Sequence, residues 1–272
     1  MPHNPFILPD GNVQISFSGG RTSAFMLHAI LEANGGLRDG VEVIFANTGR
    51  EFTETLDFVA EVGQRWGVGI TWVEYRHGLP GFEVVGRQGA SVNGEPFDAL
   101  IDARQYLPNV VSRFCTQDLK IRPAAKYLKL KGWLRWTAFI GIRADEAHRL
   151  PDPNKPRKER WTRRHPLADA GVSKRDIAAF WSRQPFDLKL RNINGVTPQG
   201  NCDGCFLKSE SKRAALIRDY PDRAAWWEKA EKRTHMAFDK RGCWAGLRDF
   251  VHRQRDWVFD AEDALCQRDD GE

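Results

Sequence analysis

The chain has 272 residues, of which 41% are hydrophobic, and this is enough to bury one complete α/β core together with a small second part. No apolar run approaches the ~18 residues that a membrane-spanning helix needs, so no membrane partner is expected. The net charge of +5 suits an anionic ligand but is too modest to indicate nucleic-acid binding by itself.

The N-terminal sequence and the cysteines bear on the compartment. Residues 1–5 lack the basic and apolar segments of a secretory signal peptide, so the expected location is the cytoplasm. Five cysteines is an odd number, and disulfides are disfavoured in a reducing compartment. Paired cysteines are therefore expected to hold a metal or to carry out redox chemistry.

The first third of the chain alternates strands and helices. Hydrophobic periodicity predicts strands at 13–17, 41–46 and 70–75, with helices at 22–33 and 52–66 between them. This order implies a mostly parallel sheet with right-handed crossovers, in a doubly wound α/β fold. Residues 77–111 show no clear periodicity and are predicted to form a lid or a substrate loop.

The rest of the chain continues this pattern and then becomes helical. A helix is predicted at 116–130, a fourth strand at 134–140, a polar loop at 143–165, and a helix capped by Ser173. The chain looks helical again after Cys205. We therefore expect a nucleotide-binding α/β domain at 1–170, a helical C-terminal part at 171–260, and a frayed acidic tail at 261–272.

The turn between the first strand and the first helix has the features of a phosphate-binding loop. It reads Ser18-Gly19-Gly20-Arg21-Thr22-Ser23. Backbone N–H groups at a helix N-terminus hold phosphate oxygens, and the hydroxyls and the guanidinium group add further donors. The spacing matches neither the Walker A motif nor the dinucleotide fingerprint. A tight turn without a ligand is the alternative, and valine at Gly19 or Gly20 is expected to abolish nucleotide binding while the fold survives.

Four segments of the chain carry recognisable motifs, in this order: the loop, residues 47–55, residues 115–123 and residues 141–149. Together they resemble the phosphoadenosine phosphosulfate reductase family of the PP-loop adenine nucleotide alpha-hydrolase superfamily, whose ATP pyrophosphatase fold is expected here. The nearest branches are adenylyl-sulfate reductases and DNA phosphorothioation sulfurtransferases. The resemblance implies Arg21, Lys120 and Arg143 as catalytic residues. It implies nucleotide contacts from Ser18, Gly19, Gly20, Arg21, Thr22, Ser23, Asn47, Thr48, Gly49, Arg143 and Arg149.

The sequence departs from the family pattern at several positions. Thr22 and Asn47 stand where many relatives have aspartate, and the first of these aspartates is a candidate ligand of a magnesium ion, which is a further possible cofactor. The C-terminal Glu-Cys-Gly…His motif of the reductases that act on the 3′-phosphorylated substrate is missing. Cys266 does not match that motif, and we interpret it as an incidental cysteine.

The turn Cys202-Asp203-Gly204-Cys205 places two thiols at the spacing that chelates a metal or one edge of a cluster. The residues alone leave open a cluster or zinc knuckle, a redox disulfide, or chance. The resemblance implies a 4Fe-4S cluster with Cys115, Cys202 and Cys205 as ligands, because Thr116 replaces the fourth cysteine. One iron would then be open to sulfide or to a substrate sulfur. Zinc stays an alternative, and Cys243 is either a fourth ligand or a small buried residue.

Residues 155–164 form a basic run that contains Lys155, Arg157, Lys158, Arg160, Trp161, Arg163 and Arg164. One interpretation is a mobile flap that contacts a nucleic-acid acceptor, with Trp161 stacking on a base. The other is a solvated loop, which charge runs usually are.

The leading hypothesis is an enzyme that cleaves ATP to AMP and pyrophosphate, adenylylates an acceptor, and transfers sulfur. The alternatives are a reductase of a sulfonucleotide, which would then occupy the cavity in place of ATP, and a non-catalytic module that binds an adenine nucleotide. The partner hypotheses are an adenine nucleotide, a nucleic-acid acceptor, a sulfur or electron donor, and a second copy of the chain.

Overall fold

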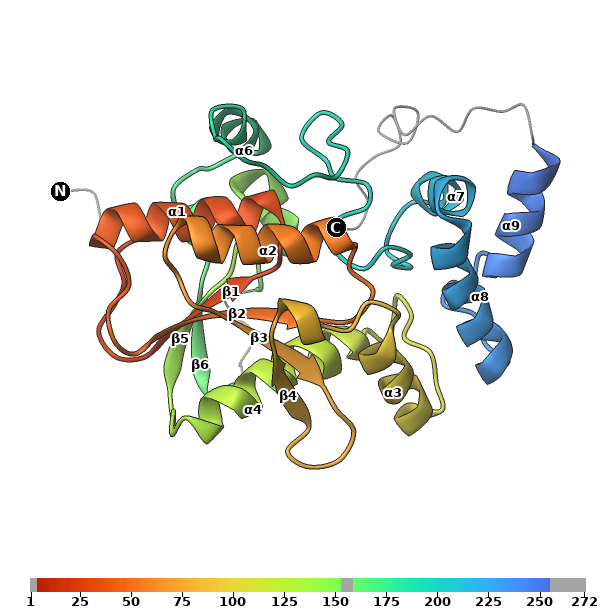
Figure 1. Cartoon of the computed structure of the whole chain (residues 1–272), viewed down its shortest axis with the longest axis horizontal. Helices are drawn as coiled ribbons and strands as arrows, with labels where there is room; N and C mark the ends of the chain where they lie inside the picture. Colours follow the sequence, from red (N-terminus) through yellow and green to blue (C-terminus); the bar gives the residue numbers. More distant parts are fainter. Residues whose placement is uncertain (1–3, 153–158, 255–272) are drawn as a thin grey trace.

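A six-stranded sheet forms the centre of the computed structural model, which describes residues 4–152 and 159–254 (Figure 1). Its strand order is β4-β3-β2-β1-β5-β6. The strands are β1 Val13–Phe17, β2 Val41–Asn47, β3 Ile70–Tyr75, β4 Phe82–Val85, β5 Trp136–Phe139 and β6 Trp161–Arg164. All neighbours pair in parallel except β3 and β4. The expected doubly wound, mostly parallel α/β fold is confirmed.

Helices cover both faces of this sheet (Figure 1). On one side lie α1 Arg21–Asn34 and α2 Thr53–Arg65, with α6 Lys174–Trp181 packed against α1. On the other side lies α4 Arg122–Leu130, which continues the π-helix η2 Thr116–Ile121. Successive side chains of β1 point to opposite faces of the sheet. Val13, Ile15 and Phe17 are buried in the core on the side of α1 and α2. Gln14 and Ser16 therefore face the layer on the other side of the sheet.

Residues 77–111 are more regular than the sequence indicated. They contain β4, the short 3-10 helix η1 Arg87–Gly89 and α3 Glu95–Arg104, so the predicted lid or substrate loop is wrong. β4 escapes a periodicity search because it is a four-residue edge strand whose middle residues, Glu83 and Val84, are both exposed. The helix α3 is short and weakly amphipathic, which also hides it.

The basic run is also partly structured. Its members Lys155, Arg157 and Lys158 lie outside the described residues, whereas 161–164 form the edge strand β6, parallel to β5. The Trp161 ring stacks on Trp136, with centroids 5.0 Å apart and an angle of 18° between the planes. A mobile flap is therefore wrong for residues 161–164, while a nucleic-acid acceptor stays a prediction.

The C-terminal part consists of α7 Glu210–Asp219, α8 Pro221–Thr234 and α9 Trp244–Arg253, which pack on one another. It docks on α3, where Asp98 accepts hydrogen bonds from Trp226 at 3.0 Å and from Arg233 at 2.8 Å. The remaining short helices are η3 Ala144–Arg149 and α5 Pro166–Asp169. The tail at 261–272 lies outside the described residues. Within residues 4–152 and 159–254, no helix has the length and apolar character needed to cross a bilayer.

Candidate functional site

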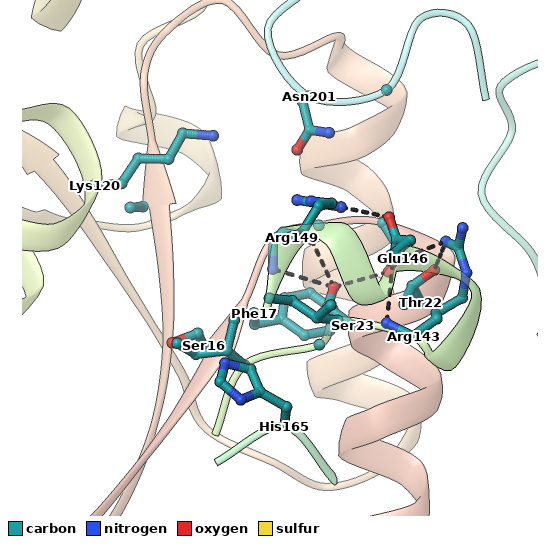
Figure 2. A pocket seen from close by; sticks show the side chains of 18 of the residues that line it. Ser16, Phe17, Thr22, Ser23, Lys120, Arg143, Glu146, Arg149, His165 and Asn201 are labelled. Atoms are coloured by element: carbon teal, nitrogen blue, oxygen red, sulfur yellow. Dashed lines mark hydrogen bonds and ion pairs between the residues drawn. The ribbon is translucent and has the colours of Figure 1, made fainter. Parts of the chain in front are cut away.

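A cavity of about 500 Å³ opens beyond the carboxyl end of β1 (Figure 2). β1 lies between β2 and β5, where the strand order reverses, and ligands of open α/β sheets bind at such a point. The cavity wall includes all six residues of the predicted loop, Ser18 to Ser23, together with Lys120, Arg143 and Arg149. The structure thus brings most of the predicted nucleotide-binding residues to one place.

The loop is held in shape by its own hydroxyl groups. The backbone N–H of Ser18 donates to Ser23 Oγ at 3.1 Å, and Ser23 Oγ donates to the carbonyl of Gly20 at 2.9 Å. Gly20 is the N-cap of α1, so the first N–H groups of that helix have no partner within it. These donors face the space where a phosphate group would bind.

The two loop glycines differ in what they tolerate. Gly19 has a left-handed φ of +78°, and a Cβ there would lie 2.7 Å from Thr55 Cγ2 and 3.0 Å from Phe45 Cε2. Gly20 has an ordinary φ of −106°, and its Cβ would meet only Ser18 Oγ, at 3.8 Å. Valine is therefore expected to destabilise the fold at Gly19 but not at Gly20.

We expect Gly19→Val to destabilise the fold by roughly 1–3 kcal/mol from overpacking, with backbone strain in addition. Gly20→Val should leave the thermal midpoint nearly unchanged but abolish nucleotide binding, because the new side chain occupies the approach to the loop. Thermal denaturation and equilibrium dialysis of both variants check this. Equal losses of stability in the two variants would contradict the geometry described above.

Arg143, Glu146 and Arg149 form a charged group beside the loop (Figure 2). Arg143 donates to Thr22 Oγ1 at 3.2 Å and to Asp145 at 2.9 Å. Glu146 accepts from the backbone N–H of Arg143 at 3.1 Å and pairs with Arg149. The 3-10 helix η3 and the residue before it thus bring two cations to the side of the cavity where α1 begins.

Arg21 is directed elsewhere. Its guanidinium group is 8% exposed and binds the Asp187 carboxylate at 2.6 and 2.8 Å and Thr197 Oγ1 at 2.9 Å. It thereby fastens the loop to the irregular segment 187–197, part of which lies on the cavity wall. Its contact with phosphate stays a prediction, and such a contact requires the ion pair with Asp187 to open.

Asn47, Thr48 and Gly49 lie beside the cavity wall but not on it. Asn47 Nδ2 donates to Glu74 at 2.6 Å, and Thr48 Oγ1 donates to Glu51 at 2.9 Å. Thr48 Oγ1 also lies 3.4 Å from Cys202 Sγ. In the structure this segment supports the cysteine turn more directly than the phosphate loop.

The three predicted metal ligands converge around Lys120. The thiols of Cys115 and Cys202 each lie within electrostatic range of Cys205 and of Lys120, whose ammonium is 3.8 Å from Glu51 Oε1. Burial, with a smaller effect of Cys205, raises the pKa of Cys115 to about 11. Burial raises the pKa of Cys202 to about 12, although Lys120 acts in the opposite direction. Burial disfavours the charge of Lys120, but Cys202 and Glu51 more than offset it and raise its pKa.

Asp203 anchors the cysteine turn to the rest of the protein. Its carboxylate is buried and accepts from Arg50 at 2.6 Å, from Arg223 at 2.6 Å and from the Trp227 indole at 2.8 Å. Gly204 has no room for a side chain, since a Cβ would lie 2.3 Å from Trp227 Nε1. The turn is therefore fixed by contacts of its own residues.

A metal ion or cluster at the three predicted cysteine ligands stays a prediction. No three His, Cys, Asp or Glu side chains of the described residues are arranged as ligands of one metal ion. Thiols are the ligands of iron–sulfur clusters, and Cys205 lies within electrostatic range of both Cys115 and Cys202. Cys243 is exposed and caps α9, with Gly246 N–H 3.4 Å from its sulfur, and Cys266 lies outside the described residues.

Several residues of the wall were not predicted, among them Gln14, Ser16, Trp136, Glu146, Lys174 and Asn201. A signal was present in the first strand. A central strand of a doubly wound sheet is covered on both faces, so the polar residues Gln14 and Ser16 needed a hydrated or ligand-filled space. Small residues opposite them, including Ala124 and Ala125 of α4, leave that space open.

Comparisons with known proteins found several similarities. The model of the phosphoadenosine phosphosulfate reductase domain matches residues 12–183. An uncharacterized nin region protein of Escherichia phage lambda is 34% identical over 216 residues, which cover 75% of this chain and 69% of that protein. An uncharacterized protein of Methanocaldococcus jannaschii is 30% identical over 135 residues, which cover 50% of this chain and only 23% of that protein.

Two solved structures are also similar. A phosphoadenylyl-sulfate reductase from Candida auris in a phosphate complex has a TM-score of 0.42 and 18% identity, covering 64% of this chain and 72% of that one. A U34-tRNA thiolase from Methanococcus maripaludis with its [4Fe-4S] cluster has a TM-score of 0.35 and 12% identity, and the match covers 89% of this chain and 81% of that one. The domain match itself ends at residue 183, before Cys202 and Cys205.

Proposed function

Because the chain belongs to the phosphoadenosine phosphosulfate reductase family of the PP-loop superfamily, we propose that it is an enzyme of sulfur chemistry that binds an adenine nucleotide in the cavity above the loop. In the proposed reaction an acceptor oxygen attacks the α-phosphorus of ATP, and pyrophosphate leaves with the acceptor's proton. A hydrosulfide ion then attacks the acceptor atom that bears the adenylyl oxygen. That bond to oxygen breaks, AMP leaves, and the acceptor carries the sulfur without any net oxidation or reduction.

The position of Lys120 is the observation that carries this proposal. Its side chain lies on the cavity wall and also within electrostatic range of Cys115, Cys202 and Cys205. Thr116 and Asn201, the chain neighbours of Cys115 and Cys202, lie on the same wall. A nucleotide phosphate on the loop and a sulfur atom near the thiols would therefore share one space.

The cations of this space have distinct tasks in the proposal. Arg143 and Arg149 would neutralise the phosphate chain, and Lys120 would stabilise the charge that develops toward the thiols. The thiols of Cys115, Cys202 and Cys205 would hold a four-iron cluster, which when bound supplies a coordination position for the sulfur donor.

A sulfonucleotide reductase is the second candidate, and the phosphate loop itself favours it. The loop contains no carboxylate, and Thr22 bonds instead to Arg143. In that reaction a thiolate of the Cys202–Cys205 pair attacks the sulfur of adenylyl sulfate, and AMP leaves. The second thiol then displaces sulfite, and the two cysteines end as a disulfide that an external dithiol must reduce.

Product analysis separates these candidates. Anaerobic protein is incubated with ATP, sulfide and a nucleic-acid acceptor, or with adenylyl sulfate plus a dithiol, and AMP, pyrophosphate and sulfite are measured. The first function predicts equimolar AMP and pyrophosphate, and the second predicts equimolar AMP and sulfite. Gly20→Val is the matched control, because it should fold but bind no nucleotide. Nucleotide that binds and is recovered unchanged in both mixtures would leave only a binding module.

A further inference from the structure

The charges that line the cavity are nearly all positive. Within the described residues, Glu146 is the one acidic side chain on the wall. The basic side chains there are Arg21, Lys120, Arg143, Arg149, Arg163 and Lys174. A phosphate chain carries several negative charges, so this wall can neutralise it directly.

The single carboxylate is already engaged. Glu146 is 8% exposed, and its Oε2 accepts from the backbone N–H of Arg143 at 3.1 Å and lies 3.5 Å from the Nη1 of the same residue. Its Oε1 pairs with Arg149. Magnesium at nucleotide sites is held by one or two carboxylates together with phosphate oxygens. Here the carboxylate holds two guanidinium groups instead.

The start of α1 is also occupied by a guanidinium group. Arg143 Nη1 lies 3.2 Å from Thr22 Oγ1, in the first turn of the helix (Figure 2). A divalent cation bound to this hydroxyl would meet the positive charge of Arg143 at close range. The same guanidinium group is well placed to meet a phosphate oxygen that accepts from the N–H groups of the loop.

We infer that the cavity binds its nucleotide as a free anion, without a bound divalent cation. Glu146 is then a positioning residue that holds Arg143 and Arg149, and these two side chains take the place of the divalent cation. This rests on the proposed function, in which the cavity takes an adenine nucleotide. Planar guanidinium groups match phosphate and sulfate oxygens in pairs and supply the charge neutralisation that magnesium supplies elsewhere. The substrate class is an uncomplexed nucleotide polyanion.

Nucleotide affinity with and without magnesium tests the inference. Equilibrium dialysis is run with ATP and with adenylyl sulfate, in EDTA and in excess magnesium. The affinity for adenylyl sulfate should be the same in both buffers within about twofold. The affinity for ATP should be at least about fivefold lower in magnesium than in EDTA, because a phosphate chain complexed with magnesium carries less negative charge. Binding of either nucleotide that is about tenfold tighter in magnesium would overturn the inference. No binding of either nucleotide in either buffer would instead overturn the proposed function.

The Glu146→Gln variant tests the role of the carboxylate. Its nucleotide affinity should fall about tenfold in both buffers, since Arg149 loses its carboxylate partner and Arg143 keeps only Asp145 of its two, and Glu146→Asp should recover part of the loss. The matched control is Glu83→Gln, which removes the exposed partner of Arg76 on the edge strand β4 and should leave the nucleotide affinity unchanged in both buffers. An unchanged or higher affinity of Glu146→Gln in EDTA, with the thermal midpoint retained, would overturn the role of Glu146. A loss confined to the magnesium buffer would identify it as a metal ligand.

Discussion

Replacing Asp203 with alanine is expected to destabilise the fold by about 3–5 kcal/mol, because it leaves an uncompensated buried charge. The carboxylate is 2% exposed and binds Arg50 and Arg223, each at 2.6 Å. Burial lowers the pKa of Arg50, and the neighbouring Asp203 acts to raise it again. Arg50 Nε already has no hydrogen-bond partner, and without the carboxylate the guanidinium group would keep a hydrogen bond to the Arg223 carbonyl at 2.9 Å and its contact with the Trp226 ring, neither of which neutralises its charge.

Urea unfolding of the wild type and the variant gives the difference in free energy. The matched control is Asp249→Ala, which removes the exposed partner of Arg248 on α9 and should cost less than about 1 kcal/mol. The loss of unfolding free energy in Asp203→Asn should lie between the losses of the two alanine variants, since the amide oxygen can still accept a hydrogen bond from one of the donors. Equal unfolding free energies for the Asp203 and Asp249 alanine variants would show that Asp203 does not anchor the cysteine turn.

The sheet was predictable because its central strands are short apolar runs separated by amphipathic helices. Val41 to Ala46 is such a run, and the structure pairs it in parallel with β1 and β3. The strands that were missed, β4 and β6, lie at the two edges of the sheet. An edge strand is solvated along one side, so polar residues such as Arg163 and Arg164 are compatible with it and its periodicity is lost.

The candidate site was predictable where a motif fixes the backbone, as in the loop from Ser18 to Ser23. It was less predictable where a side chain has a choice of partners. Arg21 follows the loop glycines in sequence, yet its guanidinium group turns to Asp187, a residue that no local pattern connects with it. Asp203 was an unassigned position between two cysteines, and its partners Arg50 and Trp227 come from distant parts of the chain.

The central claim is that the nucleotide and the thiols occupy one site. The geometry leads to this claim because the wall runs from Ser18 through Lys120 to Asn201, the residue before Cys202. A nucleotide on the loop should therefore obstruct the path by which a reagent reaches Cys115, Cys202 and Cys205. Cys243 is exposed at the start of α9 and provides an internal control in the same molecule.

Alkylation of the reduced, metal-free protein, followed cysteine by cysteine with mass spectrometry, tests this claim most directly. Saturating ATP or adenylyl sulfate should slow the alkylation of Cys115, Cys202 and Cys205 by about tenfold or more and leave Cys243 unchanged. Gly20→Val should give no protection, since it should bind no nucleotide. If dialysis proves that the nucleotide is bound and the three thiols still react at their original rates, then the loop and the cysteines do not form one site.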